Sequence, residues 1–520
     1  MKFQRSRFLK PGNLLLIGSG LLLAGVALLS LKWRMVHDAP IMMYLAYIID
    51  RFGMLPYRDF IDSNLPGTYL FFLIIGKLFG YSDLGFRLVD LLVLVLVLYG
   101  VYLWLRPFGE RTGITAALIY GFFYLGDGQI LSLQREQLVA FLIILALNVS
   151  TFSFNKRVRL AAMGFVFGLA AMIKPQSVIG LPLLLAYEYW QGFPTSVPVG
   201  NFSRIKEWFR LILWCGVGFA IPIALFCGYL VLSGTAGDFI DLVKNYWGLY
   251  YLVTGDFQTV TPAERTSYLL ERYLTFGGQI IWLAPAIYGV FLVWFKSDLA
   301  VSLKRRSLLI LSLALVYSLY PVSTGMFWRY HWLPFAFCII QAGCLVLIEQ
   351  SRVRFRWERL LPVGLLIFAV IFRIRLPGEF LQQVKGESIP PPKAGRVDAI
   401  AAFLTNHLEP GDLVQPLDGT GGAVHAMLIS KARLATPTVY DFHFYHHLEN
   451  PYIQRLKREF LTALRKTPPR FIVEIDPDKP YPIGSAATRE FPELRQYLSS
   501  FYSIAEVGEG YFIYERLAGQ

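Results

Sequence analysis

The chain has 520 residues, of which 55% are apolar and only 16% are charged. Soluble domains carry about 25% charged residues, so this composition excludes an ordinary soluble protein and favours one that spans a membrane. The formal net charge of +13 is spread over short loops between apolar runs and forms no basic stripe. This distribution argues against nucleic-acid binding and is typical of the charge bias that orients membrane proteins.

Eleven apolar segments are predicted to cross the membrane as helices, since a span needs about 20 apolar residues. They are 13–32, 86–105, 112–126, 136–153, 160–173, 177–190, 210–233, 277–295, 307–322, 331–349 and 359–376. The first has no small-residue cleavage site, so we expect a retained span and not a removed signal peptide. All four cysteines lie inside apolar segments, which predicts no disulfide framework and no cysteine-based metal site.

The orientation of the spans follows from the loop charges. The loops predicted to be cytoplasmic hold Lys2, Arg5, Arg7, Lys10, Arg106, Arg111, Lys156, Arg157, Arg159, Arg204, Lys206, Arg210, Lys296, Lys304, Arg305, Arg306, Arg352, Arg354, Arg356 and Arg359. The opposite loops hold Asp38, Asp50, Asp59, Asp62, Asp83, Asp127, Glu136, Asp238, Asp241, Asp256, Glu264 and Glu271. The positive-inside rule then places the N-terminus in the cytoplasm and the C-terminus outside. The apolar segment 66–80 is too short to span, and counting it would invert every later loop, so we expect a re-entrant or interfacial helix there.

A compositional change near residue 377 predicts a second domain. The segment 377–395 contains three consecutive prolines and is expected to be a linker between a transmembrane domain, 1–376, and an extracytoplasmic α/β domain, 396–520. Helices are predicted at 396–408 and 450–466, strands at 413–416 and 470–475, and a terminal hairpin at 501–507 and 510–516. The histidines at 425, 443, 446 and 447 lack a regular ligand spacing, so a polar loop is favoured over a zinc site.

The first outer loop carries the densest group of chemically useful side chains. Pro40 suits the first turn of a helix and Gly53 its end, and an apolar stripe between them predicts a helix in the membrane interface. Asp38 precedes this helix, where it is either a helix cap or a fixed carboxylate able to act as a general base. Tyr57, Arg58, Asp59 and Asp62 follow the helix, in either a solvated turn or a site for a polar substrate.

Further charged residues are predicted to reach the same face from later spans. Glu136 opens the fourth predicted span, where an ionisable residue is costly and often functional. Lys174 ends the fifth, and Arg329 and His331 precede the tenth. Cations in these places suit a phosphate group at the membrane surface, or alternatively the lipid headgroups. The convergence of four spans on one face favours a site.

The stretch 37–90 resembles the opening of the GT-C superfamily of integral-membrane glycosyltransferases, in the branch of the protein O-mannosyltransferases and lipid A aminoarabinose transferases. The family's pattern of glycine, proline, tyrosine, aspartate and phenylalanine after the interfacial helix is matched by Gly53, Pro56, Tyr57, Asp59 and Phe60. Members often have Asp-Glu in the first loop, where this chain has His37-Asp38. The resemblance implies a catalytic role for Asp38, and Glu136 corresponds best to the family's second acid.

The resemblance further implies transfer of a sugar from a polyprenyl-phosphate donor to an acceptor hydroxyl on the extracytoplasmic face, with inversion. Asp38 would take the proton; Lys174, Arg58 and Arg329 would bind the donor phosphate; Asp59, Asp62, Tyr57 and His331 would bind substrate. Mg²⁺ or Mn²⁺ is a possible cofactor held by the loop acids. The expected partners are the donor, a glycan, lipid or protein acceptor, and membrane lipids, and the expected location is a bacterial cytoplasmic membrane.

Two alternatives remain open at this stage. A flippase for polyprenyl-linked glycans would carry ionisable groups near the bilayer midplane, whereas these cluster at the outer rim. A glycan polymerase or ligase with a lipid-diphosphate donor would want an Arg-rich outer loop, whereas these loops carry single cations. Both comparisons favour the glycosyltransferase.

Overall fold

A computed structural model describes residues 11–192, 201–250, 263–275, 278–296, 298–324, 327–348, 357–476, 488 and 490–518. Lys2, Arg5, Arg7, Lys10, Asp256, Arg352, Arg354 and Arg356, used above for orientation, lie outside this range. The chain divides into two compact units, each assembled from three segments. The helical unit comprises Met1–Lys32, Leu88–Ala224 and Leu269–Glu387; the mixed unit comprises Trp33–Arg87, Leu225–Tyr268 and Ser388–Gln520.

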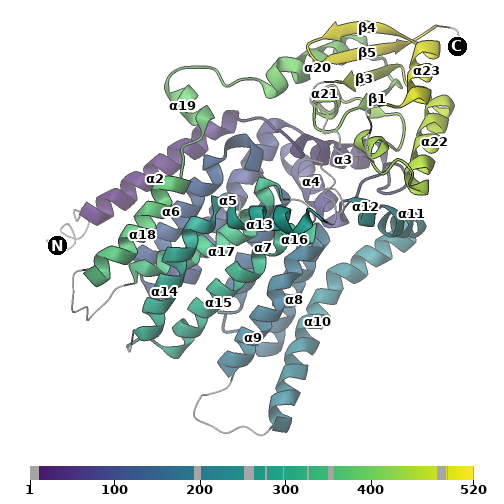
Figure 1. The fold of residues 1–520 in the computed structure, drawn as a ribbon. Coiled ribbons are helices and arrows are strands. Elements are labelled where there is room, and N and C mark those ends of the chain that lie inside the picture. Colours follow the sequence, from purple (N-terminus) through teal and green to yellow (C-terminus); the bar gives the residue numbers. More distant parts are fainter. Residues whose placement is uncertain are drawn as a thin grey trace. The chain divides into compact units, whose positions relative to one another are not determined.

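The helical unit is a bundle (Figure 1). Three of its helices, α5, α10 and α13, extend into the mixed unit. Its elements are α2 (Pro11–Leu29), α5 (Asp83–Leu105), α6 (Glu110–Gly126), α7 (Arg135–Val149), α8 (Lys156–Ile173), α9 (Leu181–Gly192), α10 (Asn201–Leu232), α13 (Arg265–Thr275), α14 (Leu283–Phe295), α15 (Val301–Tyr317), α16 (Tyr320–Thr324), α17 (Leu333–Cys344), α18 (Trp357–Arg373) and α19 (Gly378–Val384). Every residue of α17 is buried, and α17 packs against α6, α7, α14 and α15. A helix that is apolar on all sides requires such a surround, so α17 forms the core of the bundle.

All eleven predicted segments contain helix, but they differ in length. Within the described residues, five helices are long and apolar enough to cross a membrane: Gly12–Lys32, Asp83–Phe108, Phe202–Leu232, Val301–Val322 and Arg329–Leu347. Two pairs of helices with a sharp bend between them raise the number to at most seven, if each pair is one span. Helix α7 has 15 residues and α9 only 12, and at 1.5 Å per residue neither alone covers a hydrocarbon core of about 30 Å. The number of spans and their orientation therefore remain predictions.

The mixed unit contains the first predicted outer loop together with the C-terminal region. Its elements are α3 (Ala39–Phe52), α4 (Pro66–Phe79), α11 (Ala236–Leu242), the π-helix η5 (Val243–Trp247), α12 (Gly248–Tyr250), α20 (Arg396–His407), β1 (Leu413–Leu417), α21 (Ala423–Ile429), β2 (Arg433–Leu434), the short 3₁₀ helix η11 (Phe442–Tyr445), α22 (Pro451–Lys466), β3 (Phe471–Ile475), α23 (Pro492–Phe501), β4 (Tyr502–Gly508) and β5 (Tyr511–Arg516). The helices and strands predicted in 396–520, including the terminal hairpin, are confirmed. The small sheet has the strand order β2-β1-β3-β5-β4.

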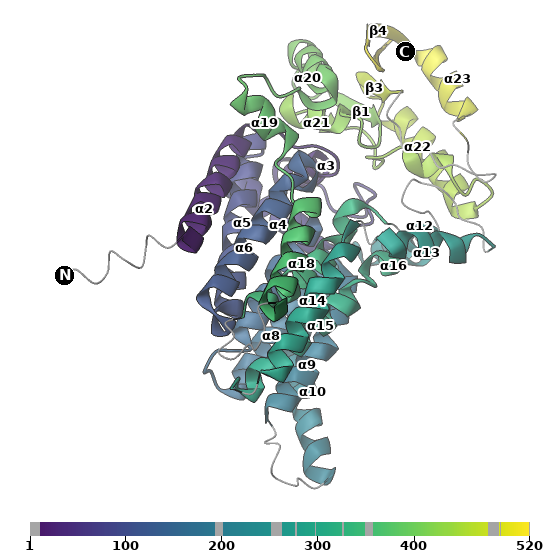
Figure 2. The same ribbon diagram turned by 60° about the vertical axis from the view of Figure 1, so that its left-hand side comes forward.

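Strand β1 is the middle one of three parallel strands in the small sheet. It pairs in parallel with β2 on one side and with β3 on the other. The connection from β1 to β2 runs through α21, and the connection from β2 to β3 runs back past β1 through α22. Because crossovers between parallel strands are right-handed, these two connections, which run in opposite directions along the sheet, place their helices on opposite faces. Figure 2 shows this arrangement, with α20 and α21 on one side of the strands and α22 and α23 on the other. Helix α22 buries Tyr452, Leu456 and Phe460, which recur every four residues on one face.

Helix α3 begins and ends close to where the sequence predicts. Pro40 lies in its first turn, and Gly53 caps its end with φ of 65°, which a residue with a side chain rarely adopts. The residues from Ala39 to Ile48 are all buried, and α3 packs against α4 and α21. Protein therefore covers most of the apolar stripe that predicted an interfacial helix, and the position of α3 at a membrane interface stays a prediction.

The domain boundaries drawn from the sequence also stay predictions. The second compact unit begins again at Ser388, inside the predicted linker 377–395, and that linker contains the helix α19. The same unit includes residues 33–87 and 225–268, which the sequence analysis assigned to the transmembrane domain. These segments join the C-terminal region through packed contacts such as that between α3 and α21, which sequence order does not reveal.

Candidate active site

The helical unit buries a carboxylate at the start of α7. Glu136 is completely inaccessible to solvent. Its Oε1 lies 3.4 Å from the Lys174 ammonium and 3.6 Å from His331 Nε2, and the Tyr320 hydroxyl donates a hydrogen bond to it over 3.4 Å. Its Oε2 has no hydrogen-bond partner among the described residues. A buried carboxylate is costly unless it is paired, so the cation and the two polar rings stabilise its charged form.

Local sequence explains how the partners of Glu136 reach it. Lys174 follows the last residue of α8 with an extended backbone, φ −145° and ψ 106°. The next residue is Pro175, which disfavours the helical conformation in the residue before it, so the helix ends there. His331 lies in a short 3₁₀ helix, Arg329–Trp332, that leads directly into α17. Three predicted site residues, Glu136, Lys174 and His331, are therefore brought together.

Arg329 belongs to the same 3₁₀ helix but points elsewhere. Its guanidinium lies 3.1 Å from a carboxylate oxygen of Asp127, and its side chain is 56% exposed. An exposed ion pair of this kind contributes little to stability. The structure therefore does not bring Arg329 into the group around Glu136.

A second buried carboxylate, Asp90, braces the loop before α7. Asp90 is fully buried in α5 and accepts hydrogen bonds from the Tyr124 hydroxyl and from the backbone N–H of Leu133 (3.1 Å). The Leu133 N–H also lies 2.7 Å from the Tyr124 oxygen. Leu133 has a positive φ of 47°, an unfavourable conformation for a leucine, three residues before Glu136. The Asp90 contacts hold this strained turn and thereby orient the start of α7.

Replacing Asp90 with Leu is expected to destabilise the protein, because the Tyr124 hydroxyl loses a buried acceptor and the Leu133 N–H loses one of its two. Each lost acceptor costs about 1–3 kcal/mol. Asp90→Asn keeps a carbonyl oxygen of similar shape and should retain most of the stability. Thermal unfolding of the two variants in lipid nanodiscs distinguishes them, and equal melting temperatures would contradict a bracing role for this carboxylate.

The mixed unit holds the second group of predicted site residues. Asp38 precedes α3 and pairs with its neighbour: His37 Nδ1 lies 3.0 Å from Asp38 Oδ1. His37 has a positive φ of 59°. The side chains of His37 and Asp38 are 27% and 21% exposed. Asp38 makes no side-chain cap on the helix that follows it, so the simple capping role considered above is not observed.

The segment after α3 separates its acids into two environments. Asp59 accepts a hydrogen bond from the Leu55 N–H (2.8 Å) and lies 3.6 Å from the half-exposed Arg58. Asp62 is buried and accepts hydrogen bonds from Tyr69 (2.6 Å), Asn64 (2.9 Å) and Tyr440 (3.3 Å). Donors from the protein therefore surround Asp62, which links the first loop to the C-terminal region.

Tyr57 stabilises the same segment through hydrogen bonds from its hydroxyl and from its backbone. The ring of Tyr57 is buried, and its hydroxyl donates to the Asn64 carbonyl over 2.9 Å. The backbone of Tyr57 has a positive φ of 72°, and its N–H donates to the Phe60 carbonyl. These bonds hold the turn that carries Arg58 and Asp59.

Asp83 connects the first loop with the C-terminal region. It accepts hydrogen bonds from the Arg34 guanidinium and the Met35 N–H, both at 2.8 Å, and lies 3.3 Å from His425 Nε2. Nη1 of Arg34 also donates to both carboxylate oxygens of Asp398 in α20, at 2.7 and 2.8 Å. Paired contacts of this geometry fix orientation. They fix the backbone that leads to His37 and Asp38.

The histidines near residue 443 lie in the interior. The Tyr246 hydroxyl and His443 Nδ1 are 2.5 Å apart, and Phe442 packs against His446. Burial and the neighbouring His446 lower the pKa of His443 to about 3, and burial and His447 lower the pKa of His446 to about 4. In the described part of the chain, no group of three or more His, Cys, Asp or Glu side chains suits a metal ion.

These two histidines are expected to make the protein acid-sensitive. Their folded pKa values lie below the unfolded value of about 6.5, so the unfolded chain binds more protons between pH 6.5 and 4, and stability falls as the pH falls through that window. The loss is on the order of 2 kcal/mol for each histidine at pH 5. We expect the melting temperature of the protein in nanodiscs to drop between pH 7 and pH 5. The drop should be smaller in His443→Gln. In the exposed control His407→Gln it should be the same as in the wild type.

Comparisons with known proteins address the architecture. A family model described as dolichyl-phosphate-mannose-protein mannosyltransferase matches residues 64–198. A search of curated proteins finds no match in sequence. ArnT from Cupriavidus metallidurans, crystallised with undecaprenyl phosphate, is similar in structure, with a TM-score of 0.60 and 13% identity over 97% of this chain and 98% of that chain. The chain has the GT-C fold.

Further solved structures complete the comparison. ArnT from the same organism in the apo state gives a TM-score of 0.58, with the same identity and coverage. The archaeal oligosaccharyltransferase AglB from Archaeoglobus fulgidus, in complex with an inhibitory peptide and dolichol-phosphate, gives 0.46 and 12% identity over 88% of this chain and 69% of that chain. The likeness to ArnT confirms the GT-C resemblance for the fold of a multi-pass membrane protein. At 13% identity it extends no further than the fold.

The predicted site residues thus form two groups, one in each unit. Glu136, Lys174 and His331 meet in the helical unit, while Asp38, Tyr57, Arg58, Asp59 and Asp62 belong to the mixed unit. Sequence reasoning missed Asp90 and Tyr320. An ionisable residue inside the predicted span 86–105 was a usable signal for Asp90. Tyr320 carried no comparable signal, because tyrosines are common in this chain.

Proposed function

We propose that the chain is a membrane glycosyltransferase that transfers a sugar from a polyprenyl-phosphate donor to an acceptor hydroxyl on the extracytoplasmic face. The observation that carries this proposal is the buried group of Glu136, Lys174 and His331 at the start of α7. A structural ion pair in a bundle of apolar helices is expensive, and a polar group there is a functional site by default. The GT-C fold, shared with an ArnT crystallised with undecaprenyl phosphate, supports a lipid-phosphate donor.

In the proposed reaction, the acceptor oxygen attacks the anomeric carbon and Asp38 takes its proton. The bond between that carbon and the phosphate oxygen breaks, and polyprenyl phosphate leaves with the electron pair. Attack from the face opposite the phosphate inverts the configuration. Preorganised cations stabilise the charge on the leaving group, and Lys174 is the first choice because its ammonium is largely buried.

The other phosphate-binding candidates keep the order expected from the sequence, and two of the substrate-binding candidates are assigned a different role. Arg58, which lies 3.6 Å from Asp59, is proposed to contact the donor phosphate, and Arg329, which pairs more closely with Asp127 at 3.1 Å, ranks below it. Asp59 and His331 are proposed to contact substrate. Asp62 and Tyr57, whose polar atoms bond to the protein, are proposed to hold the loop that carries the substrate contacts. A bound Mg²⁺ or Mn²⁺ is not part of this proposal.

The test uses the full chain in lipid nanodiscs with a panel of polyprenyl-phosphate sugars, polyprenyl-diphosphate glycans and a cell-envelope extract as acceptor. Release of free polyprenyl phosphate that depends on the extract is the expected result. Release of polyprenyl diphosphate, from the diphosphate donors alone, would support a polymerase or ligase instead. Movement of labelled donor across a vesicle bilayer without release would support a flippase.

The proposed extracytoplasmic position of the C-terminal region can be tested by cysteine labelling. A cysteine introduced at the exposed Glu509 should react with a membrane-impermeant maleimide added to intact cells, since the C-terminal region is proposed to lie outside the cytoplasm. The control is a cysteine at Lys156, the first residue of α8, at an end of the helix proposed to be cytoplasmic, and it should react only after the cells are permeabilised. The reverse labelling pattern would overturn the orientation and with it the extracytoplasmic reaction.

A further inference from the structure

An arginine cluster lies at one end of the helical unit, where α6 and α18 both end. Asp127, which follows the last residue of α6, lies 3.1 Å from the guanidinium of Arg329. Arg373, the last residue of α18, lies within electrostatic range of both of these side chains and of Arg375. Three guanidinium groups from two separate segments of the chain therefore gather around one aspartate.

Two glycines allow the backbone to close around the arginine cluster. A Cβ at Gly126 would lie 2.6 Å from the carbonyl oxygen of Arg375, and a Cβ at Gly278 would lie 2.6 Å from Nη1 of Arg373. Gly278 also has a positive φ of 82°, which residues with a side chain rarely adopt. The guanidinium of Arg373 thus lies directly against the backbone of another segment, and the fold holds it in the cluster.

The arginine cluster carries more positive than negative charge. The second carboxylate beside it belongs to Glu379 of α19, whose two oxygens would lie 2.8 Å from a Cβ at Gly128, the residue after Asp127. With both acids counted, the three arginines leave one net positive charge among these described residues. Like charges held close together are costly unless an anion neutralises them. Neutral protein partners do not change this surplus, so it does not require any arginine to lack a partner.

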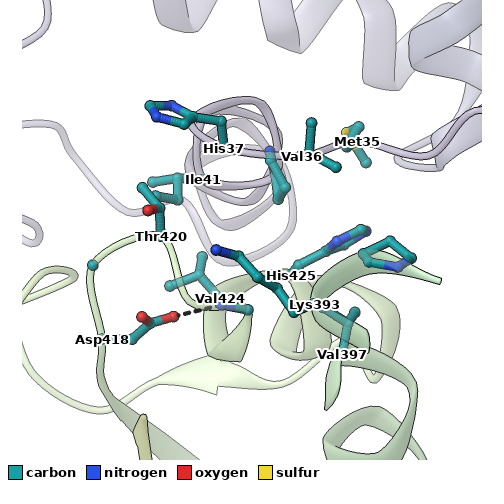
Figure 3. Close-up of a pocket in the computed structure, with 14 residues that line it drawn as sticks. Met35, Val36, His37, Ile41, Lys393, Val397, Asp418, Thr420, Val424 and His425 are labelled. Carbon is teal, nitrogen blue, oxygen red and sulfur yellow. Dashed lines mark hydrogen bonds between the residues drawn. The ribbon is translucent and has the colours of Figure 1, made fainter. Parts of the chain in front are cut away.

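The cavity at the carboxyl end of β1 in the mixed unit has no such surplus among its lining residues (Figure 3). The formal charges of Lys393 and Asp418, which both line it, cancel. Asp418 accepts hydrogen bonds from three backbone N–H groups of its own loop, and His425 lies 3.3 Å from Asp83. The arginine cluster is therefore the stronger candidate for an anionic ligand.

The surface beside the arginine cluster is apolar and exposed. One face of α18 carries four side chains that are each at least 50% exposed and that recur at a spacing of four residues: Ile367, Phe368, Ile371 and Phe372. This stripe runs directly to Arg373 and Arg375. An exposed apolar stripe on a predicted span suits contact with lipid chains, and cations at its end suit the depth of the lipid headgroups.

We propose that the arginine cluster binds the phosphate of an anionic phospholipid whose acyl chains lie along α18. Arginine pairs well with phosphate oxygens, and basic pockets between the helices of membrane proteins hold anionic headgroups. A phosphodiester with a single negative charge, as in phosphatidylglycerol, matches the surplus of the cluster. The phosphate monoester of a polyprenyl phosphate carries nearly two negative charges and exceeds it. This lipid site is independent of the proposed sugar transfer.

Native mass spectrometry tests the proposal, because it counts the lipids that stay bound to a membrane protein. The full chain is prepared in detergent with equimolar phosphatidylcholine and phosphatidylglycerol. We expect the wild type to retain phosphatidylglycerol preferentially, and the double variant Arg373→Gln, Arg375→Gln to retain at least tenfold less. Arg375 is exposed, so Arg375→Gln alone should fold normally and lose at least threefold, and this variant decides if the double variant does not fold. Arg375→Lys keeps the charge and should retain most of the binding.

The matched control is an exposed arginine beside apolar side chains on another helix. Arg204 lies near the start of α10, next to the exposed Phe202 and Ile205, and Arg204→Gln should retain as much phosphatidylglycerol as the wild type. Equal retention of the two phospholipids by the wild type would overturn the proposal, and so would unchanged retention by Arg375→Gln. A polyprenyl phosphate that displaces phosphatidylglycerol at equal concentration would also overturn it and would assign the arginine cluster to the donor.

Discussion

Asp38→Asn is expected to lower sugar transfer at least a hundredfold, because the amide cannot accept the proton of the acceptor hydroxyl. General-base catalysis contributes 10²–10⁴-fold in typical enzymes, and a hundredfold loss corresponds to about 2.7 kcal/mol in the activation barrier. The substitution keeps the shape of the side chain, and the amide oxygen can still face His37 Nδ1, which lies 3.0 Å from Asp38 Oδ1. The measurement is polyprenyl phosphate release by the full chain in nanodiscs at saturating donor.

The matched control for this substitution lies at the far end of the helix that follows Asp38. Asp50 is in the last turn of α3 and pairs with Lys77 at 3.2 Å, away from His37. Asp50→Asn should therefore transfer sugar within about twofold of the wild type. Equal release by Asp38→Asn and the wild type would remove Asp38 from the proposed mechanism and direct attention to Asp59, the other partly exposed acid of the same loop.

The elements of the C-terminal region were predictable because their signals are local. Helix α22 shows apolar residues at helical spacing, and the hairpin of β4 and β5 surrounds a Gly-containing turn, so both follow from period and turn chemistry. The grouping of residues 33–87 with 388–520 was not predictable. It depends on side chains hundreds of residues apart, such as Arg34 with Asp398 and Tyr44 with the Ala432 carbonyl.

The candidate site was also predictable only in part. Glu136, Lys174 and His331 each carry a charge or a polar ring at the end of an apolar segment, and this single signal found all three. The same signal also selected Arg329 and Asp62, because charge in a loop does not reveal which partner neutralises it. In the structure, Asp127 pairs with Arg329, and hydroxyl and amide donors surround Asp62. Those partnerships depend on tertiary contacts alone.

Lys174→Met is expected to abolish transfer and also to destabilise the protein. It leaves the fully buried Glu136 without its ammonium partner 3.4 Å away, and breaking a buried pair by removing one partner costs about 3–5 kcal/mol. Glu136→Gln in the Lys174→Met background removes the stranded charge and should restore much of the melting temperature. Transfer should not recover, since the proposed phosphate-binding cation is still absent. In the double variant, the melting temperature in nanodiscs should therefore return toward the wild-type value while the transfer rate stays low.

A second ion pair of the helical unit shows whether this separation is specific to the candidate site. Arg159 and Glu188 pair at 2.9 Å, and Glu188 is buried. Arg159→Met should lower the melting temperature by the same mechanism, and Glu188→Gln in that background should restore it. Here transfer per folded molecule should stay near the wild-type value throughout. If the double variant at Lys174 and Glu136 regains transfer with its stability, the pair is structural, and the donor phosphate must be bound by another cation such as Arg58.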